Sequence, residues 1–405
     1  MPDPSSEIPL LKGRRILLGV CGSIAAYKVA ELASRLTQAG VEVDTVLTES
    51  AQKFVSGLTF QSLTGRRAYT DSDLWSQEGH VLHIGLGQQA QLLVVAPATA
   101  DTIARLAHGR ADNLLCIAAL AAGCPIVVAP AMDAGMFEHP ATQANLAILR
   151  ERGVTVVGPA EGRMASGLIG PGRMLEPEQL LGHIRRILGR TGPLAGRKVV
   201  VTAGGTQEPL DPVRVLANRS TGKQGFALAQ AAIDRGAEVV LIAGPTSLGT
   251  PVGAARVDVH TAAQLAEAVA AALPRAAVLL MAAAVADFRP TRAERNKLKR
   301  KAGVPQVRLE PTEDILASMG KNRPQVVVGF AAESDDLLAS ARSKLEEKDL
   351  DLIVANDITA SDAGFAADTN RVTLIARNGE EQSLPLLEKA EVAERVLDRV
   401  VELLG

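Results

Sequence analysis

Small residues and hydroxyl groups follow several short apolar runs of the sequence. Gly22 and Ser23 come soon after the run Arg15–Val20, where a strand would turn into a helix. Free N–H groups at the start of a helix favour a phosphate, and small residues let the backbone come close to it. The GxGxxG fingerprint is absent, which disfavours a plain NAD site. A tight turn without a ligand is an equally good interpretation of this segment alone.

Two other runs in the first half also end in polar residues. Thr99 and Asp101 follow the apolar run Leu92–Ala96, and either residue could simply cap the helix that begins there. Asp133 follows a further apolar run and lies among methionines, a pattern that also fits a loop packed by methionine side chains. These segments therefore predict either ligand contacts or local turns.

The histidines and cysteines do not form a metal-binding or disulfide pattern. His80 and His83 are three residues apart, but no third ligand completes a zinc site. Cys21, Cys116 and Cys124 are too few for a disulfide framework, and no CxxC pair is present. The apolar, Ala-rich surroundings of Cys116 and Cys124 predict buried structural thiols.

Small residues and cations also gather in the second half. Gly204 and Gly205 follow an apolar run, as in the first half. The segment Ser220–Gly225 resembles a phosphate-binding loop, but Gln224 stands where the Walker pattern requires Ser or Thr for magnesium. The basic run 296–301 is either a solvated loop or a site for a triphosphate, because close cations are costly unless they are solvated or paired with anions.

Alternating strands and helices must position these residues. In the first half, apolar runs predict strands at Arg15–Val20, Val41–Leu47, Leu92–Ala96 and Ile126–Ala129, and helices at Ile24–Ala39, Thr102–Ala107, Asn113–Ala122 and Thr142–Arg152. The strands are continuously hydrophobic, which indicates burial on both faces, as in parallel sheets. This half therefore predicts a layered α/β domain.

The pattern restarts after a cluster of breakers at 189–197, the best candidate for a linker. The second half predicts strands at Lys198–Ala203, Glu238–Ala243, Ala277–Ala284, Gln325–Phe330 and Leu350–Ala355, helices at Gly225–Arg235, Ala262–Ala272, Glu313–Met319 and Asp336–Glu347, a small antiparallel addition after Asn370, and a closing helix at Lys389–Leu404. We therefore expect an α/β protein with two doubly wound, mainly parallel-sheet domains.

Composition excludes several classes of protein. Lys and Arg total 43 against 45 Asp and Glu, so a net charge of −2 gives no overall attraction for nucleic acid or an anionic membrane. Aromatic residues are only 2% of the 405-residue chain, which disfavours base-stacking platforms. No apolar run is long enough to cross a bilayer, and the N-terminus is unlike a signal peptide. We therefore expect a cytoplasmic protein that binds neither nucleic acid nor membranes.

Taken together, these motifs resemble one known family along nearly the whole chain. The family is the bifunctional phosphopantothenoylcysteine decarboxylase/phosphopantothenate–cysteine ligase of coenzyme A biosynthesis. The matching strings are GSIAAYK (Gly22–Lys28), APATAD (Ala96–Asp101), PAM (Pro130–Met132), IGPGRM (Ile169–Met174), EPLDPVR (Glu208–Arg214), AAAVADF (Ala282–Phe288), GFAAE (Gly329–Glu333) and ANDI (Ala355–Ile358). Each string is weak alone, but their order and spacing together are specific.

For residues 1–188 the resemblance implies a flavodoxin-like domain that binds FMN and decarboxylates phosphopantothenoylcysteine to phosphopantetheine. The positions implied for the flavin are Gly22, Ser23, Thr48, Ala98, Thr99 and Asp101. His83, and not His80, matches the family's base. A neutral imidazole there takes a proton while the flavin oxidises the thiol carbon, and the resulting thioaldehyde loses CO₂ readily.

Two positions depart from the family's pattern. Asp133 stands where the family usually has an Asn that binds the substrate carboxylate, and an ionised Asp would repel that carboxylate. We therefore expect Asp133 to be protonated, to turn to another partner, or to be bridged by a cation. Ser166 stands where the family often has a proton-donating Cys, and a hydroxyl is a far weaker acid than a thiol.

For residues 198–405 the resemblance implies a Rossmann-like ligase domain. CTP activates phosphopantothenate as an acyl-cytidylate with loss of pyrophosphate, the amine of cysteine then attacks, CMP leaves, and Mg²⁺ is expected with the triphosphate. Asn218 matches the residue that stabilises the acyl-cytidylate, and Lys297 matches the Lys that neutralises developing charge. The positions implied for CTP are Ala282, Ala283, Ala284, Asp287, Lys297, Asp314, Ile315, Phe330, Lys344 and Lys348.

The leading hypothesis is thus a two-step enzyme that makes phosphopantetheine from phosphopantothenate and cysteine. A ligase with an impaired flavin domain is one alternative, and Asp133 and Ser166 are its only support. A flavin-binding regulatory subunit is another, although Asn218, Asp287 and Lys297 argue against it. The resemblance also implies a trimeric flavin domain and a dimeric ligase domain, which would combine in a closed homo-oligomer.

Overall fold

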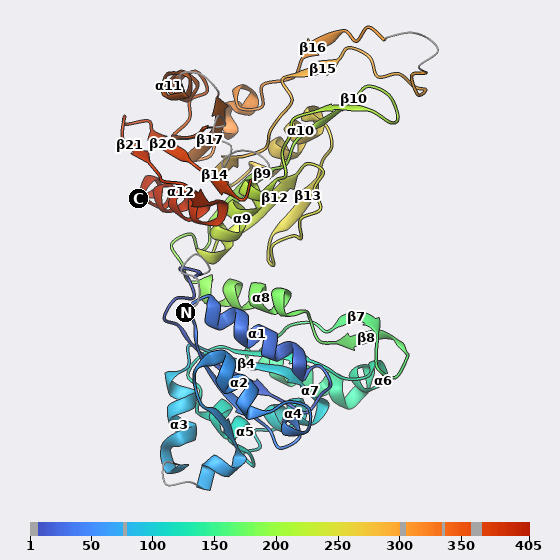
Figure 1. Ribbon diagram of the computed structural model, residues 1–405, viewed down its shortest axis with the longest axis vertical. Coiled ribbons are helices and arrows are strands. Elements are labelled where there is room, and N and C mark those ends of the chain that lie inside the picture. The colour runs from blue at the N-terminus through green and yellow to red at the C-terminus, as the bar shows by residue number, and fades with distance from the viewer. Residues whose placement is uncertain (1–6, 76–78, 300–304, 334–336, 358–366) are drawn as a thin grey trace. The chain divides into compact units, whose positions relative to one another are not determined.

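The computed structural model of the chain describes residues 7–75, 79–299, 305–333, 337–357 and 367–405. Contacts within the chain divide it into two compact units, residues 1–188 (unit 1) and residues 189–405 (unit 2). Each unit has a central sheet with helices packed against it (Figure 1). Within these described ranges, no helix is both long enough and apolar enough to span a membrane.

Unit 1 is built on a parallel sheet in the order β3-β2-β1-β4-β5-β6. Its strands are β1 (Arg15–Val20), β2 (Glu42–Leu47), β3 (Ala68–Thr70), β4 (Leu92–Ala98), β5 (Ile126–Pro130) and β6 (Thr155–Val156). Without the short edge strand β3, the order is that of a flavodoxin-like sheet, and the winding reverses between β1 and β4. Sheets of this kind bind ligands at the carboxyl ends of the strands beside that switch point.

The strands of unit 1 are buried on both faces, as their continuous hydrophobicity predicts. In β1, Leu18 and Val20 face one core and Leu17 faces the other, and all three are fully or almost fully buried. The helices that cover the sheet are α1 (Ala26–Gln38), α2 (Gly57–Thr64), α3 (Gly79–Gln89), α4 (Ala100–Ala107), α5 (Leu114–Ala121), α6 (Ala134–Glu138), α7 (Pro140–Glu151) and α8 (Pro177–Gly189). The predicted flavodoxin-like fold is confirmed.

Unit 2 has a larger sheet in the order β13-β12-β9-β14-β17-β18-β20-β21, in which every pairing is parallel except those of β20 with β18 and with β21. The strands are β9 (Lys198–Ala203), β12 (Glu238–Ala243), β13 (Ala255–Asp258), β14 (Ala276–Met281), β17 (Val326–Glu333), β18 (Leu352–Asp357), β20 (Val372–Ala376) and β21 (Glu381–Ser383). The winding reverses between β9 and β14, as in Rossmann-like sheets. The predicted antiparallel addition is β20 and β21.

The helices of unit 2 are α9 (Lys223–Asp234), α10 (Ala262–Ala272), α11 (Leu337–Glu347) and α12 (Lys389–Leu404). Side chains of β9 alternate between two cores, with Val199 and Val201 on the face covered by α9 and α12 and Val200 on the other. Helix α10 begins at a capping box formed by Thr261 and Gln264, which satisfies N–H groups that would otherwise lack partners.

Short antiparallel hairpins project from both sheets. The hairpin of unit 1 pairs β7 (Ala160–Arg163) with β8 (Ile169–Arg173). In unit 2, β10 (Gln207–Pro209) pairs with β11 (Val215–Ala217), and β15 (Phe288–Pro290) pairs with β16 (Leu309–Pro311). A further pair joins β19 (Thr369–Asn370) to β22 (Leu387–Glu388).

Two predicted elements of unit 2 differ from the structure, and hydrogen bonds explain both differences. The predicted strand Ala277–Ala284 stops at Met281, because the N–H of Ala283 donates to the side chain of Thr202 in β9 and the N–H of Ala284 donates to the carbonyl oxygen of Gly204 just after β9. The predicted helix Glu313–Met319 is absent from this part of the structure, where a 3₁₀ segment at Ala317–Asn322 follows an irregular stretch. There Asp314 accepts hydrogen bonds from two backbone N–H groups, which compete with a helix.

Two further predictions, on the linker and on the burial of the cysteines, can be compared with the structure. Segment 189–197, expected as a linker, packs on unit 2: Leu194 is fully buried, and its N–H donates to the carbonyl oxygen of Arg235. Cys116 is buried as predicted, whereas Cys124 is only half-buried. The apolar surroundings of Cys124 in the sequence therefore overstated its burial.

Candidate functional site

The predicted flavin residues of unit 1 lie at the carboxyl ends of its strands. Gly22 and Ser23 follow β1, Thr48 follows β2, and Ala98 and Thr99 end β4 and begin α4. The hydroxyls serve local turns: the Ser23 Oγ accepts from the N–H of Ala25, the Thr48 Oγ1 from Ala51, and the Thr99 Oγ1 from Thr102, at 3.2–3.3 Å. Helix capping, the alternative interpretation of Thr99, is thus observed.

Close packing at Gly22 leaves no room for a side chain. A Cβ atom there would lie 2.4 Å from the Cβ of Ser50, in the loop after β2. The two loops that follow neighbouring strands therefore touch through a glycine, at the start of α1. Such a junction brings N–H groups close to any anion bound at the switch point.

Asp101, also predicted to bind flavin, lies in the first turn of α4. Its carboxylate accepts from the Nε of Arg105 at 2.9 Å, and its side chain is 71% exposed. An i,i+4 pair of this kind is an ordinary feature of a helix surface. The geometry thus gives Asp101 a structural partner on its own helix.

The predicted base His83 lies on α3, which packs beside α5. The ring is half-buried, and its Nδ1 is buried with no hydrogen-bond partner among the described residues. A buried ring nitrogen without a hydrogen-bond partner costs free energy unless a water molecule or a bound ligand supplies the hydrogen bond. The side chain of His80 lies outside the described part of the structure.

Asp133 and Ser166, the two residues that depart from the family's pattern, contact each other. The Ser166 Oγ, in the turn of the β7–β8 hairpin, donates to the Asp133 Oδ2 at 2.6 Å. The other oxygen, Oδ1, accepts from the N–H of Gly135 at 3.1 Å, so Asp133 caps α6. Both carboxylate oxygens accept, the arrangement that an ionised carboxylate favours. Asp133 therefore has another partner in this structure.

The same hairpin is joined to the end of β5 through its backbone. The N–H of Met132 donates to the carbonyl oxygen of Gly172 at 3.0 Å. A Cβ at Gly172 would lie 2.2 Å from the carbonyl oxygen of Met132, and its φ is +156°, so only glycine fits. Close backbone contact thus holds the hairpin over the segment that carries Asp133.

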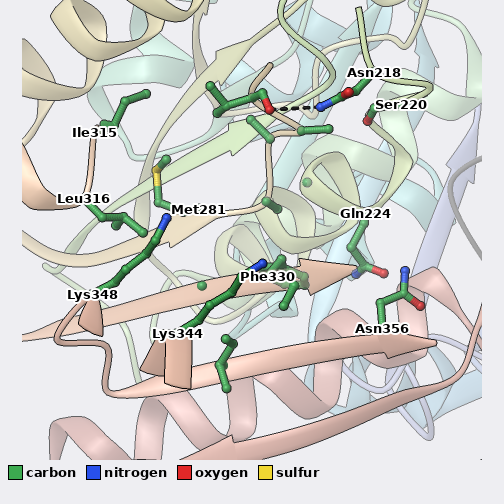
Figure 2. A pocket seen from close by; sticks show the side chains of 18 of the residues that line it. Asn218, Ser220, Gln224, Met281, Ile315, Leu316, Phe330, Lys344, Lys348 and Asn356 are labelled. Carbon is green, nitrogen blue, oxygen red and sulfur yellow. Dashed lines mark hydrogen bonds between the residues drawn. The ribbon is translucent and has the colours of Figure 1, made fainter. Parts of the chain in front are cut away.

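A pocket of about 480 Å³ lies in unit 2 and contains most of the residues predicted for the ligase (Figure 2). It is lined by Asn218, Ala282, Ala283, Ala284, Asp287, Asp314, Ile315, Phe330, Lys344 and Lys348, among others. These residues come from five separate segments of the chain, which the sheet brings together at the carboxyl ends of β14 and β17. Lys297 is absent from the lining of this pocket.

Hydrogen bonds between neighbouring strand ends shape the wall formed by Ala282–Ala284. The buried Thr202 Oγ1, at the end of β9, accepts from the N–H of Ala283 at 3.1 Å. The N–H of Ala284 donates to the carbonyl oxygen of Gly204 at 2.8 Å. Asn218 reaches the same wall, because its Nδ2 donates to the carbonyl oxygen of Val285 at 2.9 Å (Figure 2).

Two lysines of α11 form the cationic side of the pocket. Lys344 and Lys348 are one turn apart and extend into it beside Phe330 and Met281 (Figure 2). The Nζ of Lys348 lies 3.5 Å from the Oδ2 of Asp314, which also lines the pocket. Its acidic partner therefore belongs to another segment, and not to the Glu-rich surface of α11.

Sequence reasoning missed two carboxamides in the lining. Gln224 donates from Nε2 to the carbonyl oxygen of Lys389 at 3.1 Å, which leaves its buried Oε1 without a partner among the described residues. Asn356 also has a buried Oδ1 that lacks one there. The broken Walker pattern at Gln224 and the ANDI string at Asn356 are the signals that could have identified them.

Both halves of the chain match known families. Residues 5–189 match the family described as "Flavoprotein", and residues 194–404 match "DNA/pantothenate metabolism flavoprotein C-terminal domain". "Coenzyme A biosynthesis bifunctional protein CoaBC" of Bacillus subtilis (strain 168) is 44% identical over 398 residues, 97% of this chain and 98% of that one. The protein of the same name from Mycobacterium tuberculosis (strain ATCC 25618 / H37Rv) is 45% identical over 409 residues, 97% of each.

A solved structure is similar to part of this chain. It is the crystal structure of the C-terminal domain of a coenzyme A biosynthesis bifunctional protein CoaBC, with 38% sequence identity and a TM-score of 0.46. It covers 53% of this chain and 98% of that one.

Proposed function

Because the chain belongs to the family of bifunctional coenzyme A biosynthesis proteins, we propose that each unit carries out one of the family's two reactions. The enzyme joins phosphopantothenate to cysteine with CTP and decarboxylates phosphopantothenoylcysteine to phosphopantetheine. In our proposal unit 2 is the ligase and unit 1 the flavin-dependent decarboxylase. The observation that carries this assignment is the unit 2 pocket, which gathers ten of the predicted ligase residues.

The unit 2 pocket has the charges that activation of a carboxylate needs. A carboxylate is a poor electrophile, and transfer of CMP to it creates a good leaving group. Lys344 and Lys348 can neutralise phosphate oxygens, and the backbone of Ala282–Ala284 can hold the nucleotide. The amide of Asn218, held by the carbonyl oxygen of Val285, would contact the acyl-cytidylate.

Mg²⁺ enters this proposal together with the nucleotide. Among the described residues, no cluster of three His, Cys, Asp or Glu side chains is arranged to hold a metal ion. Mg²⁺ commonly keeps several waters and binds substrate phosphates with one or two carboxylates. Asp287 and Asp314 line the pocket and are the candidates for that role.

The use of CTP also supports a cytoplasmic location.

The strand ends of unit 1 fit a flavin phosphate. Gly22 admits no Cβ because Ser50 packs against it, so the loops after β1 and β2 meet just before α1, where the N–H groups of a helix start favour an anion. Bound FMN would supply a two-electron oxidation of the cysteinyl thiol carbon and, after the carboxylate has left as CO₂, would return both electrons, so that the product is phosphopantetheine. His83, whose buried Nδ1 has no partner among the described residues, would take a proton from the substrate.

Asp133 and Ser166 would act as one hydrogen-bonded unit in the decarboxylase. While Ser166 donates to Asp133, part of the charge that would repel a substrate carboxylate is compensated. The Ser166 hydroxyl can pass a proton between Asp133 and the substrate, although it is a weak acid by itself. A ligase with an impaired flavin domain is the second candidate, and this pair is the observation that favours it.

Single substitutions in the full-length enzyme test the assignment of the units. Asn218→Ala should stop formation of phosphopantothenoylcysteine and leave decarboxylation of added phosphopantothenoylcysteine unchanged. His83→Gln should have the opposite effect. The assignment is wrong if either substitution stops the reaction of the other unit while the protein remains folded and loaded with FMN.

Exposed apolar side chains support the proposed homo-oligomer. Unit 1 exposes Ile24 and Tyr27 beside its flavin loop, each at 63%. Unit 2 exposes Val213 at 63% and Phe288 at 52% on or beside its projecting hairpins. Patches of this kind often mark interfaces. We propose a trimer through unit 1 and a dimer through unit 2, and light scattering of Tyr27→Glu and Phe288→Glu variants would test each contact.

A further inference from the structure

A buried carboxylate in the EPLDPVR segment has no role in the proposed reactions. Asp211 lies in the turn between β10 and β11, and its side chain is completely buried although the following residues of the turn are exposed. Its Oδ1 accepts from the N–H groups of Val213 and Arg214, both at 2.8 Å. These two bonds account for the turn and leave Oδ2 for another purpose.

The second oxygen reaches a segment far away in the sequence. The Asp211 Oδ2 accepts from the N–H of Leu298 at 3.1 Å. The guanidinium of Arg214 bridges the same two residues, because its Nη1 donates to the Asp211 Oδ2 at 3.2 Å and to the carbonyl oxygen of Leu298 at 3.3 Å. Leu298 is therefore held at both its N–H and its carbonyl group.

This contact fixes the peptide plane next to Lys297. The N–H of Leu298 belongs to the peptide bond that joins it to Lys297, so its direction sets where the Lys297 side chain begins. A third bond holds the segment nearby: the N–H of Glu294 donates to the carbonyl oxygen of Leu210 at 2.9 Å. Lys297 itself is exposed and lies outside the pocket lining.

The electrostatics of Asp211 suit a permanent anchor. Burial by itself would raise the pKa of this carboxyl group. The N–H groups of Val213, Leu298 and Arg214, together with the charge of Arg214, outweigh burial and lower the pKa below its ordinary value. The ionised form accepts all four hydrogen bonds and donates none.

We propose that Asp211 is a positioning residue that holds the backbone of Lys297 where its charge can serve cytidylyl transfer. The proposal rests on the ligase function proposed above for unit 2 and on the role in charge neutralisation that the family resemblance implies for Lys297, which itself lies outside the pocket lining. A lysine on an exposed segment has many conformations, and a fixed backbone reduces the entropy lost when its ammonium meets a phosphate. Through this contact, the EPLDPVR segment acts on the basic segment more than 80 residues away.

A double-mutant cycle tests the proposal on the full-length enzyme. Steady-state pyrophosphate release from CTP, phosphopantothenate and cysteine is measured for wild type, Asp211→Asn, Lys297→Ala and the double variant. The amide introduced by Asp211→Asn would present a donor where Leu298 needs an acceptor, or would lose the bonds to the turn. We expect D211N to lower kcat by about 10- to 100-fold with little change in the KM for cysteine, and to have no further effect when Lys297 is already Ala.

Controls separate this role from a merely structural one. Glu310→Gln breaks an ion pair with Arg289 on the neighbouring β15–β16 hairpin and should leave kcat unchanged. Arg214→Met keeps the Asp211 turn but removes the bridge to Leu298, so it should show the same dependence on Lys297 even if D211N folds poorly. Hydrogen exchange of the Leu298 N–H should accelerate in D211N.

Each remaining outcome has a distinct meaning. An equal loss of kcat in the wild-type and Lys297→Ala backgrounds would overturn the positioning role, as would an unchanged kcat in both D211N and Arg214→Met. If Lys297→Ala alone leaves pyrophosphate release unchanged, the proposed role of Lys297 fails and the positioning role fails with it. The ligase assignment of unit 2 would still rest on the Asn218→Ala test.

Discussion

The hydroxyl of Ser166 donates a 2.6 Å hydrogen bond to the carboxylate of Asp133, 33 positions earlier in the chain. The bond joins the turn of the β7–β8 hairpin to the start of α6. The family resemblance implies Asn and Cys at these two positions, and in this chain the residues that stand there are hydrogen-bond partners. A change at one position therefore alters the charge presented by the other.

Removing the Ser166 hydroxyl should expose this coupling. In Ser166→Ala, the Asp133 Oδ2 loses its donor, and the carboxylate should repel the substrate carboxylate more strongly. We expect the KM for phosphopantothenoylcysteine to rise by about 3- to 10-fold, which corresponds to about 1 kcal/mol for a partly solvated charge pair. Asp133→Asn should lower that KM instead. Steady-state decarboxylation kinetics measure both effects.

A serine outside the hairpin provides the control for this pair of variants. Ser34→Ala removes a hydroxyl that accepts from Gln38 on the surface of α1, and it should leave the KM at its wild-type value. The same KM in wild type, Ser166→Ala and Asp133→Asn would show that Asp133 does not face the substrate.

Gly22 should be the most sensitive position for flavin binding. In Gly22→Ala the new Cβ would lie 2.4 Å from the Cβ of Ser50, so the loops after β1 and β2 must separate. We expect FMN affinity to fall by about 10-fold or more, since a shift of the backbone misaligns its N–H groups toward the phosphate. Quenching of flavin fluorescence on binding measures the Kd.

The matched control is Gly123→Ala in the loop before β5, where an added Cβ meets no atom within 4 Å and no positive φ is involved. This variant should bind FMN as wild type does. Wild-type affinity in Gly22→Ala as well would place the phosphate elsewhere in unit 1.

The two lysines of α11 should contribute to CTP binding through charge. Lys348→Ala should raise the KM for CTP by about 10-fold or more, because a charge-assisted contact to phosphate is worth roughly 1.5–3 kcal/mol. The KM for cysteine should stay unchanged. Arg342→Ala on the same helix is the control, since Arg342 pairs with Glu381 and does not line the pocket. Equal effects of both variants on the KM for CTP would contradict the assignment.

The thiols should be unreactive in the folded enzyme at neutral pH. Burial raises the pKa of Cys21 to about 12 and that of Cys116 to about 11. At pH 8 each should therefore react with iodoacetamide more than about 100-fold more slowly than the same thiol in the unfolded chain. Half-buried Cys124, whose pKa burial also raises, should react first. Mass spectrometry after timed labelling would reveal the order, and rapid labelling of Cys21 would contradict its burial.

The raised pKa values of these cysteines also predict how the free energy of unfolding changes with pH. The folded form holds these thiol protons more tightly than the unfolded chain does. The stability that the protonated thiols give the fold is thus fully present below the ordinary thiol pKa. It falls as pH rises from about 9 toward 12. Cys21→Ala should reduce that alkaline loss in urea unfolding experiments.

The sequence predicts what depends on local pattern. The continuous hydrophobicity of β1 and β9 results from burial on both faces, and both strands begin and end as predicted. Helices such as α10 and α12 were also predicted with their observed bounds, because an apolar stripe and capping residues mark them. The fold class and the strand-end loops could therefore be inferred before the structure.

Contacts between distant segments could not be inferred in this way. Asp314 was predicted in a helix, yet its side chain accepts from the N–H of Leu316 and pairs with Lys348, 34 positions later in the chain. The partners of Asp133 and Asp211 lie 33 and 87 positions away, in loops whose approach depends on the whole fold. No local signal identifies such pairs, and the roles of these residues in catalysis stay predictions.

The most direct test of the two-reaction account is the product formed from phosphopantothenate, cysteine, CTP and Mg²⁺ by the FMN-loaded enzyme, identified by mass spectrometry. The account predicts phosphopantetheine, together with CMP, pyrophosphate and CO₂. Accumulation of phosphopantothenoylcysteine would contradict the decarboxylase function and place the failure in unit 1, where Asp133 and Ser166 differ from the family. Absence of both products would contradict the account as a whole.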